Sequence, residues 1–356
     1  MRDKQASIVF APPLIVLLLA ATALLLRLQG AATEGAWHNA YADMPFLTAP
    51  SLPTFLQQIR TQDPAALPLY FALQYYWYQW VSTSVFGLRL LDISLGVLAI
   101  PFVYALGARL YGRRAGYVAA LCLAVSPAHT YYVHAMSEHT LLILLATASF
   151  WSLLRLLQRG KPSGWRAHGV AAMLLYWTHP AALLVPIAQG CWLLLHRRLY
   201  RAPLPGWLVM HAMLAFPAVS YLLTVGARPS GNADHGLPSR LGGLFLHDIS
   251  VIHQHLLPTG NGAFFAVSLF TGYGITIVLA VACLAYWLPK MHARGLDRRM
   301  LCNTRLVLCW LVVPPLTLVL LSLVWWPCIS PCYTVHGVIA VYLLLGGAVQ
   351  GVLNNS

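Results

Sequence analysis

Residues 67–142 decide the fold, because they hold two apolar runs of about membrane length on either side of a basic turn. They read LPLYFALQYYWYQWVSTSVFGLRLLDISLGVLAIPFVYALGARLYGRRAGYVAALCLAVSPAHTYYVHAMSEHTLL. A helix that crosses the hydrocarbon core of a bilayer needs about 20 mostly apolar residues. Residues 88–108 and 115–132 approach this length, and we predict that both are membrane-spanning helices.

The composition extends this prediction to the whole chain. Of 356 residues, 59% are apolar and only 9% are charged, whereas soluble domains carry about 25% charged residues. We therefore expect a single all-α, polytopic transmembrane domain over residues 1–356, with both termini cytoplasmic. The first apolar run is long for a signal peptide and is interpreted as a retained span. About ten spans are predicted: 8–26, 88–108, 115–132, 139–158, 165–178, 181–196, 206–226, 263–288, 303–325 and 334–352.

The net charge of +13 is interpreted as a topology signal, not as a nucleic-acid interface. Lys and Arg gather in short loops near 109–114, 159–166, 197–201 and 290–299, and the positive-inside rule places these loops in the cytoplasm. The expected partners are membrane lipids, with no nucleic acid. Neither GxxxxGK[ST] nor GxGxxG occurs, so no phosphate loop for a nucleotide is predicted.

The segment 67–85 is long enough to cross the membrane, but its many Tyr and Trp residues favour a position at the headgroup level. If it crossed, every later basic loop would lie outside. We therefore expect interfacial juxtamembrane helices within a first extracytoplasmic segment, 27–87, and a second large outer loop at 227–262. Ten of the fourteen histidines then face outward, which places the polar chemistry on the outer face.

Several motifs occur in the order seen in one family of membrane enzymes. They are Pro68-Leu69-Tyr70, the Arg89-Leu90 pair, the turn from Gly112 to Gly116 and the run from Ser126 to Tyr132. In these motifs the chain resembles the GT-C glycosyltransferases, in the branch of protein O-mannosyltransferases and bacterial lipid A or lipopolysaccharide sugar transferases. The resemblance implies a GT-C bundle in a bacterial inner membrane that moves a sugar from a polyprenyl-phosphate donor to an extracytoplasmic acceptor.

An inverting transfer of this kind needs a base for the acceptor, and positive charge or a metal for the leaving phosphate. The family's base lies in an Asp-Glu pair just after the first span, and here Asn39-Ala40 stand in its place. Asp43, one helical turn later, is the first candidate base, and His38 is a second. Asp63 is a third candidate, although an Asp before a Pro is more typical of a turn.

The resemblance also implies a set of residues that contact the donor phosphate or its lipid: Arg89, Tyr70, His129, Tyr132, His134, Glu138 and His179. Arg89 either meets a lipid phosphate or ties the interfacial helix to the bundle through carboxylates, with Asp92 three residues on as an i, i+3 partner, and the sequence leaves both open. Glu138 is more readily explained as a charge at a helix N-terminus, and His179 as a structural histidine. Where family members often have Pro-Arg-Tyr, this chain has Cys332 in place of the Arg.

No metal site or other cofactor is predicted. His253 and His255 with Asp248 could bind a divalent ion, but His-x-His spacing is not diagnostic. A disulfide between Cys328 and Cys332 is equally undecided. Because the usual active-site charges are missing, the alternative function is an inactive GT-C scaffold or a lipid-binding subunit of a larger membrane complex; a transporter is a weaker third.

Overall fold

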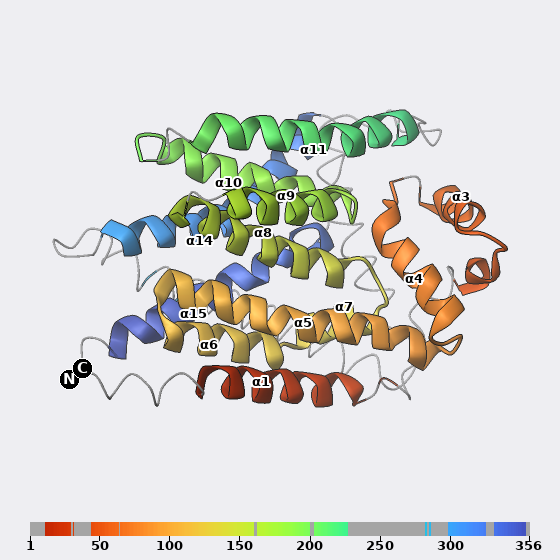
Figure 1. Ribbon diagram of the computed structural model, residues 1–356, viewed down its shortest axis with the longest axis horizontal. Helices are drawn as coiled ribbons and strands as arrows, with labels where there is room; N and C mark the ends of the chain where they lie inside the picture. The colour runs from red at the N-terminus through yellow and green to blue at the C-terminus, as the bar shows by residue number, and fades with distance from the viewer. Residues whose placement is uncertain are drawn as a thin grey trace.

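The chain is an all-helical bundle in the computed structural model, which describes residues 11–29, 31, 44–63, 65–159, 162–199, 203–226, 282, 285, 298–324 and 331–353. No β-strand occurs in these ranges, which confirms the predicted all-α fold class. Most helices run side by side along the long axis of the molecule, and α3 and α4 lie at one end of it (Figure 1).

The helices follow one another with short connections. In chain order they are α1 (Ala11–Leu28), η2 (Met44–Thr48), α3 (Leu52–Gln62), α4 (Pro68–Trp80), α5 (Val85–Tyr111), α6 (Arg113–Ala124), α7 (Pro127–His134), α8 (His139–Arg159), α9 (Pro162–Tyr176), η3 (Pro180–Leu183), α10 (Leu184–Leu195), α11 (Pro203–Gly226), α14 (Arg298–Val324), η4 (Pro331–Gly337) and α15 (Val338–Leu353).

Each predicted span within the described ranges has helical counterparts, but the third is broken into α6 and α7. Ser126 caps α7, because its hydroxyl accepts the His129 backbone N–H at 3.1 Å, and Pro127 occupies the first helical position. Among the described residues, five helices are long and apolar enough to cross a membrane. Two shorter apolar helices, within 13–28 and 180–195, add to them. Apart from residues 282 and 285, the predicted span 263–288 lies outside the described residues, as does the whole outer loop 227–262.

The helix α4 agrees with the predicted interfacial position of this segment. It has 13 residues and is therefore about 20 Å long, which is short of the ~30 Å hydrocarbon core. Figure 1 shows it at the end of the bundle where α5 begins, at an angle to the long helices. Trp80 is 78% exposed and stacks on Tyr76 at a centroid distance of 4.7 Å. An exposed aromatic pair of this kind suits the membrane interface.

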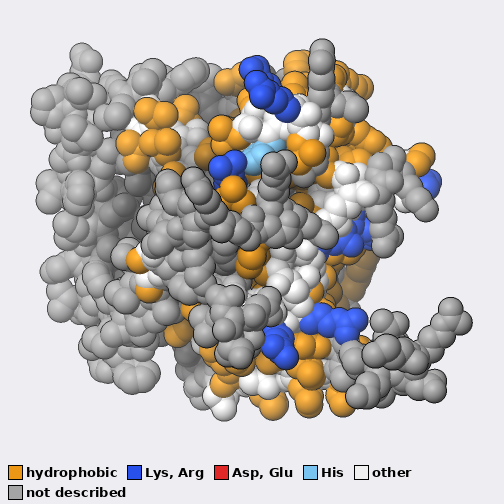
Figure 2. Space-filling view, turned by 90° about the vertical axis from the view of Figure 1, so that its left-hand side faces the viewer, with side chains coloured by type: hydrophobic (Ala, Val, Ile, Leu, Met, Phe, Trp, Pro, Cys, Tyr) orange, Lys and Arg blue, Asp and Glu red, His pale blue; other side chains and the backbone are white. Residues whose placement is uncertain are grey.

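The two ends of the bundle differ in charge. Arg109 ends α5 and Arg113 begins α6, at the end opposite α4. Figure 2 looks onto this end, where several Lys or Arg side chains are seen and no coloured side chain is acidic. The acidic residues of the described ranges, Asp63, Asp92 and Glu138, belong to elements at the other end. This separation is what the positive-inside rule leads one to expect.

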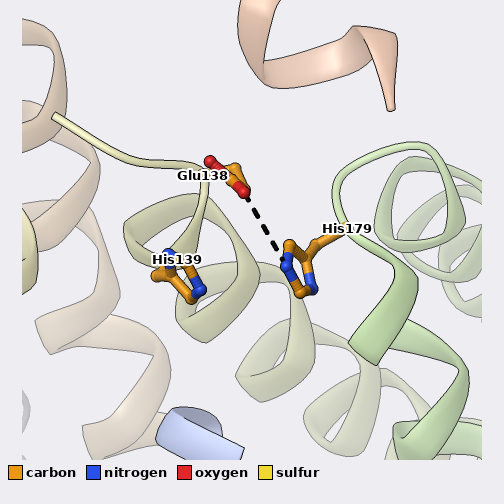
Figure 3. Close-up of side chains that lie close together, drawn as sticks. All are labelled: Glu138, His139 and His179. Atoms are coloured by element: carbon orange, nitrogen blue, oxygen red, sulfur yellow. Dashed lines mark ion pairs between the residues drawn. The ribbon is translucent and has the colours of Figure 1, made fainter. Parts of the chain in front are cut away.

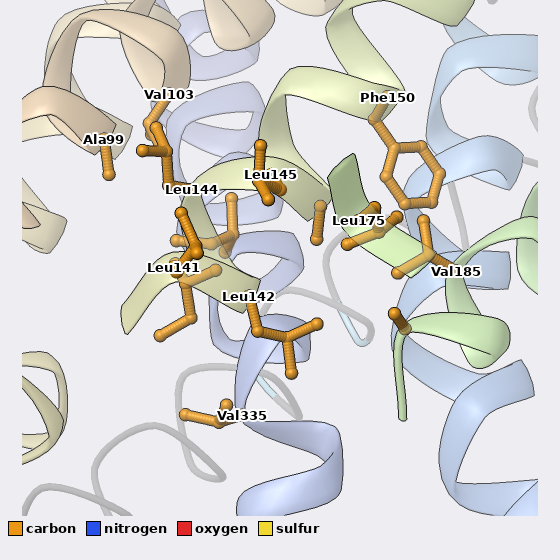
Figure 4. Close-up of a cluster of buried hydrophobic side chains, with 14 of the residues drawn as sticks. Ala99, Val103, Leu141, Leu142, Leu144, Leu145, Phe150, Leu175, Val185 and Val335 are labelled. Carbon is orange, nitrogen blue, oxygen red and sulfur yellow. The ribbon is translucent and has the colours of Figure 1, made fainter. Parts of the chain in front are cut away.

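The helix α8 forms the centre of the bundle. Leu142, Leu145 and Phe150 lie on it and pack among side chains from α5, α9, α10 and η4 (Figure 4). Phe150 stacks on Trp310 of α14, with ring centroids 4.0 Å apart, and the Trp310 indole N–H donates to His336 at 2.9 Å. By contrast α1 and α11 lie at opposite edges of the bundle in Figure 1, and large apolar side chains on both are exposed, as expected for helices that face lipid.

The Gly112 to Gly116 turn has two separate steric reasons for its glycines. Gly112 has a backbone φ of +109°, a region that residues with a side chain rarely occupy. A Cβ on Gly116 would lie only 2.6 Å from the carbonyl oxygen of Tyr104, so α5 and α6 can approach this closely only with glycine there. Gly346 of α15 lies in the same way against the backbone of Ala115.

A hydrogen-bonded chain joins α8, α9 and α11 inside the bundle. The Tyr176 hydroxyl contacts His211 Nδ1 at 2.5 Å, the Nε2 atoms of His211 and His168 are 3.1 Å apart, and His168 Nδ1 contacts the Ser152 hydroxyl at 3.0 Å. The Trp207 indole N–H also donates to His168 Nε2, at 3.2 Å. This chain gives each of these buried polar side chains a partner, as the absence of water in a bilayer requires.

Candidate functional site

Polar side chains converge at the end of the bundle beside α4. They come from the first turns of α4 and α5, the turn between α7 and α8, the turn between α9 and η3, and η4. These elements are far apart in sequence.

Tyr70 and Asp92 join α4 to α5. The Tyr70 hydroxyl donates to Asp92 Oδ2 at 2.9 Å, and both side chains are buried. Pro68 at the start of α4 fixes the first turn that carries Tyr70. Asp92 also interacts electrostatically with Glu138, and within the described ranges its Oδ1 has no hydrogen-bond partner. Two neighbouring carboxylates away from water favour a proton or a cation between them.

Glu138 and His179 face each other across the turns that precede α8 and follow α9. Glu138 Oε1 lies 3.7 Å from His179 Nε2 (Figure 3). His179 is also the N-cap of η3, because its Nδ1 accepts the Ala181 backbone N–H at 3.0 Å. Burial, and then the neighbouring His139 and His336, hold the pKa of His179 well below its usual range. His179 is therefore neutral at pH 7.

His139 completes this cluster, although the sequence did not single it out. Its Nδ1 lies 3.1 Å from the Ser137 hydroxyl, while its buried Nε2 has no partner among the described residues. Its ring lies 5.0 Å from that of His179 and 5.3 Å from that of Tyr132, between centroids. One ligand atom each from Glu138, His139 and His179 lies within 4.8 Å of the others, which makes them the residues that could hold a metal ion.

His129 and His134 face a different partner, Arg27 at the end of α1. The Arg27 guanidinium donates to His129 Nδ1 at 2.8 Å and to the carbonyls of Leu123 and Ala124 at 3.0 Å. His134 Nε2 contacts the Arg27 carbonyl at 2.7 Å. These two histidines therefore lie in a buried joint between α1, α6 and α7. Their proposed contact with a donor lipid has no direct support from this geometry.

Arg89 is fully buried and donates to the carbonyl of Ala31 at 2.5 Å. This contact joins α5 to the residues that follow α1, and both sequence interpretations of Arg89 stay predictions. Asp63 is exposed, and its Oδ1 accepts the Ala65 N–H at 2.9 Å, as expected of a turn residue. Asp43 and His38 lie outside the described residues and remain predictions.

Sequence reasoning missed three parts of this region: Arg27, His139 and the bond between Tyr70 and Asp92. A signal existed for Arg27, because a charged residue at the end of an apolar run is costly to bury without partners. For His139 and the Tyr70 bond there was no local signal, since the contacts join distant segments.

Comparison with known proteins agrees with this description. The sequence model of the family described as Dolichyl-phosphate-mannose-protein mannosyltransferase matches residues 67–222. Among curated proteins, none matches this sequence.

Among solved structures, the chain is similar to the archaeal oligosaccharyltransferase AglB from Archaeoglobus fulgidus, solved with an inhibitory peptide and a dolichol-phosphate. The TM-score is 0.59 and the identity 14%, over 97% of this chain and 51% of AglB. A second structure of the A. fulgidus oligosaccharyltransferase, tethered to an acceptor peptide, gives a TM-score of 0.55 at 16% identity, over 98% and 50%. ArnT from Cupriavidus metallidurans bound to undecaprenyl phosphate gives 0.44 at 14%, over 95% and 77%.

The chain thus spans about half the length of the oligosaccharyltransferase that it matches. The described helices, their arrangement and the match over residues 67–222 agree with one another. The chain therefore has the GT-C type of fold that it shares with the oligosaccharyltransferase AglB, and its residues 67–222 match the mannosyltransferase family model.

Proposed function

We propose that the chain transfers a sugar from a polyprenyl-phosphate donor to an acceptor on the extracytoplasmic face of a bacterial inner membrane. The shared fold supports this proposal, as does the family description, which names a dolichyl-phosphate-linked mannose as donor. AglB, the protein with the similar fold, was solved with a dolichol-phosphate. Both termini are assigned to the cytoplasm because the basic turns lie at the end of the bundle opposite α4.

The observation that carries the proposal is the convergence of Tyr70, Asp92, Glu138 and His179 at one end of the bundle. These residues lie within the matched range, 67–222, but come from four different elements. Buried ionisable side chains at the end of a membrane bundle are expensive unless they serve a site. Their position beside the interfacial helix α4 suits a donor whose lipid stays in the bilayer and whose phosphate lies at its surface.

The chemistry assigned to the site is a single displacement at the anomeric carbon. The acceptor oxygen forms a bond to that carbon, the bond from the carbon to the phosphate oxygen breaks, and the polyprenyl phosphate leaves with the electron pair. A base takes the acceptor proton, which is the role proposed for Asp43, with His38 and Asp63 as alternatives. Tyr70, Tyr132, Glu138 and His179 are proposed to form the side of the site that faces the donor.

A transfer assay tests this function. The full chain in liposomes is offered undecaprenyl-phosphate-linked and dolichyl-phosphate-linked hexoses together with membrane extract as acceptor, and release of the free polyprenyl phosphate is measured by mass spectrometry. Asp43→Asn keeps the shape of the side chain and should lower the rate by about 10² or more if Asp43 is the base. Arg198→Ala, an exposed arginine at the end of α10, should leave the rate unchanged.

The inactive scaffold is a second candidate, because Arg89 is fully buried on a backbone carbonyl and is not displayed to a lipid phosphate. In that case no donor would be turned over, and the chain would purify with a membrane partner in a fixed ratio. Binding of a polyprenyl phosphate without release from any sugar donor would favour a lipid-binding subunit. Turnover that is equal in the wild type and in Asp43→Asn would refute Asp43 as the base.

A further inference from the structure

We propose that Glu138, His139 and His179 bind a divalent metal ion, with zinc as the best match, and leave one coordination position open to a phosphate oxygen. Metal binding stands on the geometry of these three residues alone. Only the role of the open position rests on the proposed function.

The geometry brings three potential ligands together from two turns of the chain. The potential ligand atoms of Glu138, His139 and His179 lie within 4.8 Å of one another, and Figure 3 shows the carboxylate and the two rings grouped together. Around a tetrahedral zinc with bonds of about 2.0–2.1 Å, ligand atoms are about 3.3 Å apart. Small side-chain rotations are therefore enough to close the set around an ion.

The protonation states suit a cation. The Ser137 hydroxyl lies beside His139 Nδ1 and allows the ring proton to sit there, which leaves the lone pair on the buried and unpartnered Nε2. Asp92 interacts electrostatically with Glu138. A bound cation would stabilise both carboxylates.

Binding at His179 requires one rearrangement. While His179 Nδ1 accepts the Ala181 N–H, the ring proton sits on Nε2, the atom that faces Glu138. A metal on Nε2 moves this proton to Nδ1 and displaces the Ala181 bond. The cost is one backbone hydrogen bond at the start of η3, which is small beside the strength of three metal bonds.

An ion here would supply the positive charge that the sequence otherwise lacks. The family's Pro-Arg-Tyr arginine is replaced by Cys332 in this chain. Two histidines and one carboxylate form a three-ligand zinc set, and such sets keep a fourth position for water or substrate. A phosphate oxygen in that position would be stabilised as it gains charge during departure of the leaving group.

The test uses the full chain in detergent, stripped of metal with a chelator, and Zn²⁺ alone as the probe in isothermal titration calorimetry. Co²⁺ absorption gives a second readout, since tetrahedral Co²⁺ has intense visible bands. We expect one tight site per chain. Glu138→Gln, His139→Asn and His179→Asn should each weaken it by at least about 10–100-fold, the loss seen when mere supporting residues of a metal site are changed. His179→Asn retains a side-chain acceptor for the η3 cap, and His139→Asn retains a donor near Ser137.

Two controls address the other histidines of the chain. His196→Gln, on a half-buried histidine at the end of α10, should leave the affinity unchanged. A double variant, His253→Gln with His255→Gln, should also bind normally. The proposal is overturned if no stoichiometric site is found, if the tight site survives both His139→Asn and His179→Asn, or if only the double variant removes it. Because no sugar donor is present, absence of binding would refute the metal site without touching sugar transfer.

Discussion

Replacing Arg27 by Met should show whether Arg27 and its histidine partners stabilise the packing of α1 or bind the donor lipid. Arg27 is fully buried, and its guanidinium donates to two carbonyls at the end of α6 and to His129 Nδ1. Met has a similar length and no donors. The substitution therefore removes the charge-assisted bonds and keeps most of the apolar packing.

The magnitude follows from these three bonds outside α1. At about 1.5–3 kcal/mol for each bond to a charged group, their gross loss is about 4–9 kcal/mol. Releasing a buried cation offsets part of this loss, and Leu123 keeps a 3.3 Å bond from the Ser126 N–H. We expect a net loss of about 3–5 kcal/mol, because buried acceptors lose a charged donor.

The assay is reversible unfolding in mixed micelles with increasing sodium dodecyl sulfate, followed by circular dichroism. Arg198→Ala is the control, since that arginine is exposed at the opposite end of the bundle. Binding of undecaprenyl phosphate to the folded Arg27→Met protein should be unchanged. A stability loss below about 1 kcal/mol would refute the structural account of Arg27. Normal stability with lost lipid binding would return His129 and His134 to the donor site.

Three further predictions concern the turn glycines and the polar cluster. Gly116→Ala should cost about 1–3 kcal/mol by overpacking, whereas Gly337→Ala, where a Cβ meets nothing within 4 Å, should be neutral; equal effects would contradict the steric account. Tyr70→Phe leaves a buried carboxylate oxygen without its donor and should cost about 1–3 kcal/mol, unlike the exposed Tyr76→Phe. Because the pKa of His179 is lowered in the folded state, the unfolded chain binds more protons than the folded one below pH ~6.5, and the free energy of unfolding should fall by up to about 1.4 kcal/mol for each pH unit of acidification. In His179→Asn, the free energy of unfolding measured between pH 7 and 5 should depend less on pH. An unchanged pH dependence would argue against the lowered pKa.

Hydropathy and charge predicted the helical bundle and most of its segment boundaries, because both depend on contacts of each segment with lipid or water. The prediction of a short interfacial helix near Pro68 is consistent with α4, whose length is set by the local pattern. The break between α6 and α7 escaped prediction, since Ser126 and Pro127 interrupt the backbone without lowering the apolar content.

The candidate site was predictable only one residue at a time. Glu138 and His179 were both identified, but their proximity depends on how α8 packs against α9. Local spacing suggested a pair of Arg89 and Asp92, but it gave no sign of the bond between Asp92 and Tyr70 of another helix. The partners of Arg27 lie on α6 and α7, beyond the reach of any short-range rule.

The contact of Gly346 with the backbone of Ala115 has a consequence for biogenesis. The ribosome makes α6 early, yet the helix that fills its groove is made after all the other described helices of the bundle. Until α15 inserts, the groove beside α6 must be occupied by lipid or by an insertase. Assembly of this bundle therefore finishes late, and a bulky residue at position 346 should leave newly made chains open to membrane proteases.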